Sequence, residues 1–331
     1  MKKKLLLLLF GIFLFSGCGK YGEKEIIRDF SKKVSDADAY YIDGTLEIVN
    51  NDNVYNYDVE VAFKEKDYYR VSLTNTSNNH TQVILKNDDG VYVVTPALNK
   101  SFKFQSDWPY SNSQIYLLET IVQDIKNDKE RVFKKTKDGY SFMTEVNYPN
   151  NRNLVKQKIN ISKKLKLDKV QVYNSDSVIC MTMKYRKIDY SPVFKKNYFS
   201  LNTVMKTYSY DDTVAEAGVL EESIYPLMLP SGTKLTNEEK IDKGDGERII
   251  MTFDGEKPFL LVEETANIES EFTVIPTYGK PYQLMDTLGV MTNNSLNWTT
   301  NGIEYYLVSD VLNQEELIEV AQSIGVVHTM K

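Results

Sequence analysis

Residues 54–75 read VYNYDVEVAFKEKDYYRVSLTN, and this stretch decides the predicted fold. Apolar and polar residues alternate through two runs, which a charged break at 64–67 separates. Alternation with a period of two is typical of antiparallel strands with one face in the core and the other in water. The stretch therefore predicts two neighbouring strands. Their inward residues are Tyr55, Tyr57, Val59, Val61 and Phe63 in the first, and Tyr69, Val71 and Leu73 in the second.

The same rhythm continues along the chain to about residue 190, with hairpin signals at Asp89-Gly90 and Asp138-Gly139. Two segments break it, 25–35 and 113–126, where apolar residues recur at the three-and-four spacing of amphipathic helices. A sheet of so many strands curls because each strand twists. We expect a mainly β (α+β) protein in which residues 25–205 form a curved antiparallel half-barrel wrapped around covering helices.

A second unit follows the half-barrel. Residues 206–220 contain the acidic pair Asp211-Asp212 and are predicted to be a linker, and 221–331 a small α+β domain. Asn301-Gly302 indicates a hairpin, and a helix is expected over Gln314–Ile324 with Ser309-Asp310 as its cap. Extended segments are expected around Arg248–Phe253 and Pro258–Glu263.

The N-terminus indicates export. Met1–Lys4 is basic, and the apolar run Leu5–Phe15 is about half as long as a membrane span. The run ends at Ser16-Gly17-Cys18, which resembles the lipobox of bacterial lipoproteins, in which the peptidase cuts before a cysteine that carries a diacylglyceryl group. An ordinary signal peptide with an incidental cysteine is the alternative. We expect a signal peptide over 1–17, acyl chains (palmitate) on Cys18, a tether over 18–24, and a lipid-anchored protein on the extracytoplasmic face of the cell membrane.

Composition narrows the function. The net charge is −6, so no large basic surface and no nucleic-acid partner are expected. Cys180 is the only cysteine besides Cys18, which excludes a disulfide scaffold and predicts a buried strand residue. With two histidines and no nucleophile motif, phosphate loop or metal-ligand spacing, the sequence predicts no enzyme, no metal site and no cofactor. The acidic pair in Gly244–Glu247 indicates a solvated turn rather than a catalytic dyad.

Three features together resemble a known family. They are the aromatic-Arg strand at Tyr69-Arg70, the Asp-Gly hairpin followed by Thr95-Pro96, and the helix around Ser113–Ile125. Over 25–205 the chain resembles the LolA/LolB-like outer-membrane lipoprotein-sorting superfamily, in its branch of YdcC-like and GerS-like sporulation and germination lipoproteins of spore-forming Gram-positive bacteria. The C-terminal LNWTTNGIEYYLVSDVLNQEELIEVAQSI is similar to a small domain of such lipoproteins and of some membrane regulators.

The resemblance implies two functions. The first is a non-enzymatic binding or scaffold lipoprotein in sporulation or spore germination, with a cell-wall (cortex) hydrolase or amidase as partner. The second is lipid or acyl-chain binding on the apolar concave face, as in the carriers of this superfamily. The candidate ligand residues also have a simpler interpretation, because apolar strand faces most often pack against covering helices. These candidates are Tyr57, Val59, Val61, Phe63, Val71 and Leu73.

Three further residues are candidates for an interaction site. Trp108 and Tyr110 lie in the segment 107–113, and such aromatic residues dominate interface energetics. That segment is predicted either to be an exposed interaction loop or to plug the rim of the barrel. Arg70 is predicted either to hydrogen-bond to the covering helix or to be a solvated edge charge.

Overall fold

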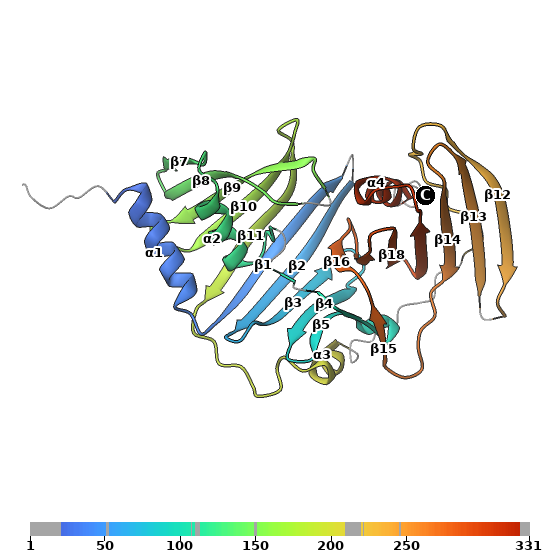
Figure 1. Cartoon of the computed structure of the whole chain (residues 1–331). Helices are drawn as coiled ribbons and strands as arrows, with labels where there is room; N and C mark the ends of the chain where they lie inside the picture. Colours follow the sequence, from blue (N-terminus) through green and yellow to red (C-terminus); the bar gives the residue numbers. More distant parts are fainter. Residues whose placement is uncertain are drawn as a thin grey trace, which may run out of the picture.

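The computed structural model describes residues 21–50, 53–106, 108–109, 113–148, 151–208, 220, 222–244 and 246–324. Two curved, open β-sheets dominate this part of the chain, and a few helices cover them (Figure 1). The predicted fold class, a mainly β half-barrel followed by a small α+β unit, is confirmed. Within the described ranges, no helix combines the length and the apolar character that crossing a membrane requires.

The larger sheet has twelve strands in the order β15-β6-β5-β4-β3-β2-β1-β11-β10-β9-β8-β7. Its neighbours pair antiparallel except β15, which runs parallel to β6. The predicted turn signals Asp89-Gly90 and Asp138-Gly139 lie at the hairpins that connect β4 to β5 and β7 to β8, where each glycine is the first residue of the second strand. The strands are β1 (Ala39–Asn50), β2 (Asn53–Lys64), β3 (Tyr68–Asn75), β4 (Thr81–Asn87), β5 (Gly90–Thr95), β6 (Lys100–Phe104), β7 (Val132–Lys135), β8 (Gly139–Glu145), β9 (Leu154–Ser162), β10 (Leu167–Asn174), β11 (Ile179–Asp189) and β15 (Thr273–Thr277).

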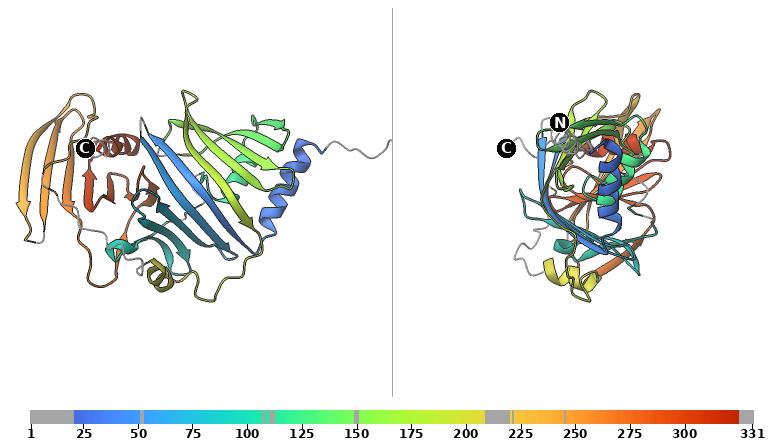
Figure 2. Two further views of the ribbon diagram at one scale, coloured as in Figure 1. Left: turned by 180° about the vertical axis from the view of Figure 1, so that it is seen from behind. Right: turned by 90° about the vertical axis from the view of Figure 1, so that its left-hand side faces the viewer.

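Two helices, α1 (Glu23–Ser35) and α2 (Leu118–Asn127), lie inside the curve of this sheet (Figure 2). The apolar stripe of α1, made of Ile26, Phe30 and Val34, is buried in the same core as the inward side chains of the strands. The predicted second helix starts five residues late. Residues 115–116 form a turn before it, and the Thr120 hydroxyl of α2 donates to the carbonyl of Gln114 at 2.9 Å.

A bulge bends the central pair of strands. The register between β1 and β11 shifts at Asp43-Gly44, and a Cβ at Gly44 would lie 2.4 Å from the carbonyl oxygen of Lys184. Bulges bend strands and increase their twist. Gly44 therefore permits a close backbone approach at the point where the half-barrel curves.

The convex face corrects one prediction. Alternation predicted a wet outer face, which holds for Asn56 and Glu60 of β2 but is wrong for β3 to β5. There a short helix, α3 (Leu201–Tyr208), and the residues before it cover the outer face. The sequence reading missed this helix and placed a linker from 206, whereas 206–208 are helical. Residues 209–219 lie outside the described part. The outer-face core beneath α3 includes Ala62, Val83, Leu85, Tyr92 and Val94.

The second sheet has seven strands in the order β12-β13-β14-β19-β18-β17-β16. One face packs on α4 (Gln314–Ile324), at the bounds that the sequence predicts. The predicted cap is wrong: Asn313 exchanges hydrogen bonds with Glu316, while Ser309 accepts from the backbone amides of Val311 and Leu312. The strands are β12 (Thr233–Asp242), β13 (Glu247–Gly255), β14 (Phe259–Thr265), β16 (Lys280–Gln283), β17 (Leu288–Met291), β18 (Ser295–Thr300) and β19 (Ile303–Val308); a short 3-10 turn, η1 (Pro96–Leu98), precedes β6.

The polypeptide chain passes from the smaller sheet to the larger one and back, which joins the two sheets. After β14 the chain leaves the smaller sheet, adds β15 to the edge of the larger one, and returns to form β16 (Figure 1). Leu288 and Val290 of β17 belong to the core of the larger sheet. At the opposite side of the smaller sheet, β12 pairs with β13 alone and is exposed along most of its length.

Candidate functional site

A partly apolar cavity lies where the two sheets meet. Its volume is about 510 Å³. The inner face of the larger sheet supplies one wall, and α4 together with the segment 281–288 supplies the other. Apolar clefts of this size with a few polar groups are the usual form of a small-ligand site. Its apolar lining includes Leu46, Ile48, Ile84, Ile115, Tyr116, Leu284, Met285, Leu288 and Ile318.

Hydrogen bonds hold the segment 281–288 against the half-barrel. The Tyr57 hydroxyl donates to the carbonyl of Met285 at 2.6 Å, and the Gln82 side-chain oxygen accepts from the amide of Leu288 at 2.6 Å. Tyr57 lies on β2 and Gln82 on β4, the strands on either side of β3. The second unit thus places its own side chains in the open end of the half-barrel and leaves the cavity behind them.

The mouth of the cavity is polar. Arg152 and Glu315 approach to 3.7 Å there, and the backbone amide of Arg152 donates to the same carboxylate at 2.9 Å. Glu319 and Gln322 lie further along the same side of α4. Deeper in, burial raises the pKa values of Tyr116 and Tyr148, so both phenols are neutral. The arrangement can enclose an apolar group and leave a polar end at the mouth.

The six predicted concave-face residues lie in the core beneath α1 and α2. Five of them are almost completely buried, and Phe63 is half-buried. None of the six lines the 510 Å³ cavity. Tyr57 and Leu73 border a separate cavity of about 50 Å³, and Phe63 borders a hollow near α2. The structure brings these residues together, but around side chains of the protein itself.

Arg70 lies on the convex face, where neither predicted environment applies. It is 5% exposed, its guanidinium carbon lies 4.6 Å from the ring centre of Tyr198, and it lies 5.4 Å from that of Tyr208. Contacts of this kind are favourable when the cation is desolvated. Arg70 therefore helps to hold α3 and the preceding segment on the sheet.

The remaining candidates fall in three different places. Trp108 is buried, packs edge-on against Tyr69 with ring centres 5.6 Å apart, and lines the large cavity. Tyr110 and Cys18 lie outside the described residues. Cys180 is in a strand as predicted, but it is half-buried rather than buried, because β11 begins at the mouth of the cavity.

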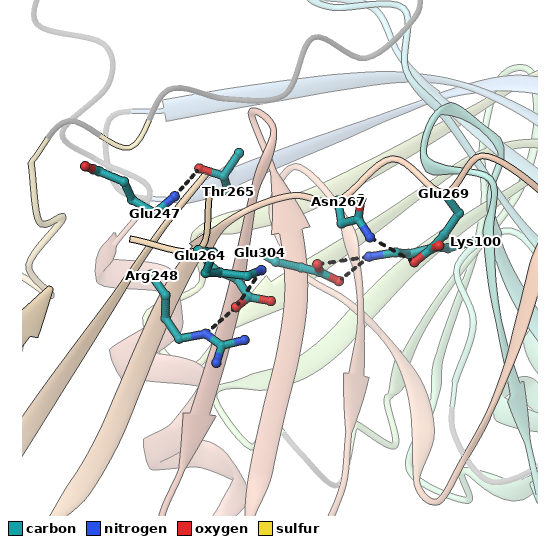
Figure 3. Close-up of polar contacts among 9 residues, drawn as sticks. Lys100, Glu247, Arg248, Glu264, Thr265, Asn267, Glu269 and Glu304 are labelled. Carbon is teal, nitrogen blue, oxygen red and sulfur yellow. Dashed lines mark hydrogen bonds and ion pairs between the residues drawn. The ribbon is translucent and has the colours of Figure 1, made fainter. Parts of the chain in front are cut away.

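A buried ion pair also joins the two sheets (Figure 3). The Lys100 ammonium of β6 lies 3.0 Å and 3.2 Å from the two carboxylate oxygens of Glu304 in β19, and both side chains are less than a tenth exposed. Glu264 on the adjacent strand carries its own partners, Arg248 at 2.5 Å and Lys243 at 3.5 Å. Charges this deeply buried require pairing. The Lys100–Glu304 pair therefore links β6 of the larger sheet to β19 of the smaller one.

One buried carboxyl lies elsewhere in the smaller sheet. Glu263 is fully buried, accepts a hydrogen bond from the amide of Ile224 at 2.9 Å, and has a second oxygen without a partner among the described residues. Burial raises its pKa to about 7. Across the described ranges, no three His, Cys, Asp or Glu side chains are placed to hold a metal ion.

Sequence reasoning missed most of the cavity lining. The alternation of β1 contained the signal for Leu46 and Ile48, which share the inward face with Ile42. No local pattern indicates that Met285 and Ile318 come to lie opposite them, because that contact spans more than two hundred residues of chain.

These observations define a class, a half-barrel protein whose second unit closes one end over an apolar cavity. The sequence is 36% identical over 330 residues to "Sporulation protein YdcC" of Bacillus subtilis (strain 168), and the match covers 98% of this chain and 97% of that protein. The chain therefore belongs to the YdcC sporulation protein family, which confirms the predicted branch. No protein-family model matches the chain.

Two solved structures are similar to about half of this chain. One is the CwlD amidase from Clostridioides difficile in complex with the GerS lipoprotein, at 20% identity and a TM-score of 0.32, covering 51% of this chain and 96% of that one. The other is a LolA superfamily protein from Nitrosomonas europaea, at 10% identity and a TM-score of 0.31, covering 54% and 97%. At these scores the likeness carries no functional argument.

Proposed function

We propose that this protein is a non-enzymatic, membrane-anchored lipoprotein that acts as a binding or scaffold protein at the outer face of the membrane during sporulation or spore germination. The observation that carries the proposal is the near full-length match to a sporulation protein. The lipobox at Cys18 supports the anchor and the extracytoplasmic location. The packing of the concave face supports a scaffold, because most inward side chains of the larger sheet pack against α1 and α2. The proposed partner is a cell-wall (cortex) hydrolase or amidase.

Crosslinking in sporulating cells tests the scaffold. The anchored protein is captured with its partners and compared with a Cys18→Ala variant expressed at the same level. We expect a cell-wall hydrolase or amidase to be recovered with the anchored protein and to be depleted with the variant, which should remain as uncut precursor. Membranes that yield no such partner would refute the scaffold, and normal membrane retention of the variant would refute the lipobox.

The alternative function is binding of a lipid or acyl chain, and the 510 Å³ cavity favours it. An apolar chain would occupy the space between β1 and α4, with its polar end near Arg152 and Glu315. In this alternative the six concave-face residues support the floor of the site rather than line it.

Native mass spectrometry of the mature chain with Cys18→Ser tests the alternative. Co-purified lipid should be lost when Cys180→Phe fills the mouth of the cavity, and retained in the matched Val178→Phe variant, whose side chain lies outside the cavity on an exposed position two residues earlier. The absence of bound lipid in the unsubstituted chain would count against lipid binding and leave the scaffold proposal intact.

A further inference from the structure

Positive charge is concentrated in one short part of the chain. Residues 129–169 contain 12 Lys and Arg against 4 Asp and Glu, a net charge of +8, although the whole chain carries −6. Residues 221–331 have the opposite composition, with 7 Lys and Arg against 19 Asp and Glu, a net of −12. The net charge of the whole chain therefore averages over two regions of opposite sign.

The fold gathers these lysines on two adjacent turns. One connects β7 to β8, and the other connects β9 to β10. The turns touch, since the amide of Lys163 donates to the carbonyl of Asp138 at 3.3 Å. Six lysines, two at the end of β7 and four on the turns, are exposed, and in the described structure none of them is in an ion pair with a carboxylate. They are Lys134, Lys135, Lys137, Lys163, Lys164 and Lys166.

Helix α1 adds lysines to this basic surface. Its exposed positions Lys24, Arg28 and Lys32 follow one another four residues apart, so they share one face, and Arg28 is paired with Asp29 at 2.7 Å. Near its C-terminal end, the Lys33 ammonium donates to the carbonyl oxygens of Lys164 and Leu165 at 3.1 Å. Burial lowers the pKa of Lys33, and the nearby Lys166 charge lowers it further. We call α1 and the two turns the basic end.

The basic end is also where the chain enters the fold. Tyr21, the first described residue, contacts the ring of Tyr140 in β8, with ring centres 6.4 Å apart. Cys18 precedes it by three residues, which span at most about 10 Å. An acylated Cys18 at the membrane surface therefore keeps the start of α1 and Tyr140 of β8 close to the lipid headgroups, at a distance comparable to the Debye length of about 8 Å at physiological salt. Figure 1 shows α1 and β7 to β9 at one end of the molecule and β12 at the other.

We propose that the basic end binds the anionic phospholipid headgroups of the membrane that carries the anchor. This inference rests on the proposed acylation of Cys18. Attraction at the basic end and repulsion of the acidic smaller sheet then orient the molecule, with α1 against the membrane and β12 to β14 facing away. Each lysine close to an anionic surface strengthens binding by about fivefold. The contact weakens as salt rises, because it is electrostatic.

Co-sedimentation with vesicles tests the proposal without the acyl chains. The mature chain with Cys18→Ser is mixed with vesicles of phosphatidylglycerol and phosphatidylcholine, or of phosphatidylcholine alone, at low and at high salt. We expect binding to the anionic vesicles only, with loss at high salt. Substituting Gln for Lys134, Lys137, Lys163, Lys164 and Lys166 should weaken that binding by at least about 100-fold.

A matched control carries five Gln substitutions at exposed lysines on other elements, and it should bind as the unsubstituted chain does. Circular dichroism must show both variants folded. These control lysines are Lys195, Lys196, Lys206, Lys234 and Lys280.

Three outcomes would overturn the proposal: equal binding to neutral vesicles, equal loss in the control variant, or binding to a soluble poly(glycerol phosphate) or to DNA with none to anionic vesicles. Vesicle binding could fail while the acylated protein still fractionates with membranes and recovers its partner. That result would refute headgroup binding by the basic end and leave the proposed function intact.

Discussion

The two sheets differ in how much of their surface is covered by helices. The larger sheet is covered on both faces along β3 to β5, by α1 and α2 inside the curve and by α3 outside it. The smaller sheet is covered by α4 on one face, and its outermost strand β12 is exposed. The larger sheet therefore supplies most of the buried core, while the smaller one keeps backbone and side chains available at the surface.

The difference does not make the sheets independent. Strand β15, the hydrogen bonds of Tyr57 and Gln82, and the Lys100–Glu304 pair all join them. If these links matter, damage at the junction should lower the stability of both sheets, whereas damage within one sheet should scale with how deeply its residues are buried.

The largest effect is expected at the junction. Lys100→Ala leaves the Glu304 carboxylate buried and unpaired, which should lower the free energy of unfolding by about 3–5 kcal/mol. Denaturant unfolding measures this, and the double variant Lys100→Met, Glu304→Leu should recover most of the loss. The exposed Lys234→Ala is the control. A loss below about 1 kcal/mol would show that the sheets meet without this pair.

A pH effect of similar size is expected inside the smaller sheet. The pKa of Glu263 is about 7 in the folded protein against 4.5 ordinarily, because burial disfavours the carboxylate. The folded state therefore binds the proton more tightly, and stability falls as pH rises from about 4.5 to above 7, by about 3 kcal/mol. Glu263→Gln should remove this part of the pH dependence, measured by unfolding at pH 5 and pH 8. An unchanged pH profile in the variant would contradict the assignment.

A smaller difference should separate the outer faces of the two sheets. Tyr208→Phe removes the 2.6 Å hydrogen bond between the Tyr208 hydroxyl and buried Ser72, and should cost about 1 kcal/mol. Tyr225→Phe removes an exposed hydrogen bond of 2.5 Å to Glu238 in the smaller sheet and should cost less. Thermal melts measure the stability lost in each variant. Equal losses would mean that burial beneath α3 does not strengthen the hydrogen bond between Tyr208 and Ser72.

The smallest effect is expected on β12. Glu239 is exposed and lies on a strand with one neighbour, so Glu239→Ala should change the free energy of unfolding by less than about 0.5 kcal/mol. Denaturant unfolding is sufficient to measure it. A loss above 1 kcal/mol would indicate that β12 is covered in solution, and the two sheets would then be more alike than the structure shows.

Local patterns predicted the elements well. The alternation around Val59 and Val71, the Asp-Gly turns and the bounds of α4 follow from interactions between residues that are near in sequence. The burial of Arg70 did not follow from the same patterns, because Tyr198 and Tyr208 cover it from more than a hundred residues away.

The candidate site was predicted less completely for the same reason. The inward residues of β2 and β3 were identified correctly as apolar and buried, yet the cavity lies where α4 and Met285 meet β1. A pattern read along one strand reports which face is dry. It carries no information about which distant segment covers that face.

Strand β15 has a consequence for the order in which the protein can be completed. It is the edge strand beside β6, and its residues 273–277 are synthesised long after β6 itself. Until they arrive, β6 presents unpaired amides and carbonyls, and exposed strand edges of this kind recruit other chains. The N-terminal half-barrel is therefore most vulnerable to aggregation while its C-terminal third is still emerging, and truncation before residue 273 would make that vulnerable state permanent.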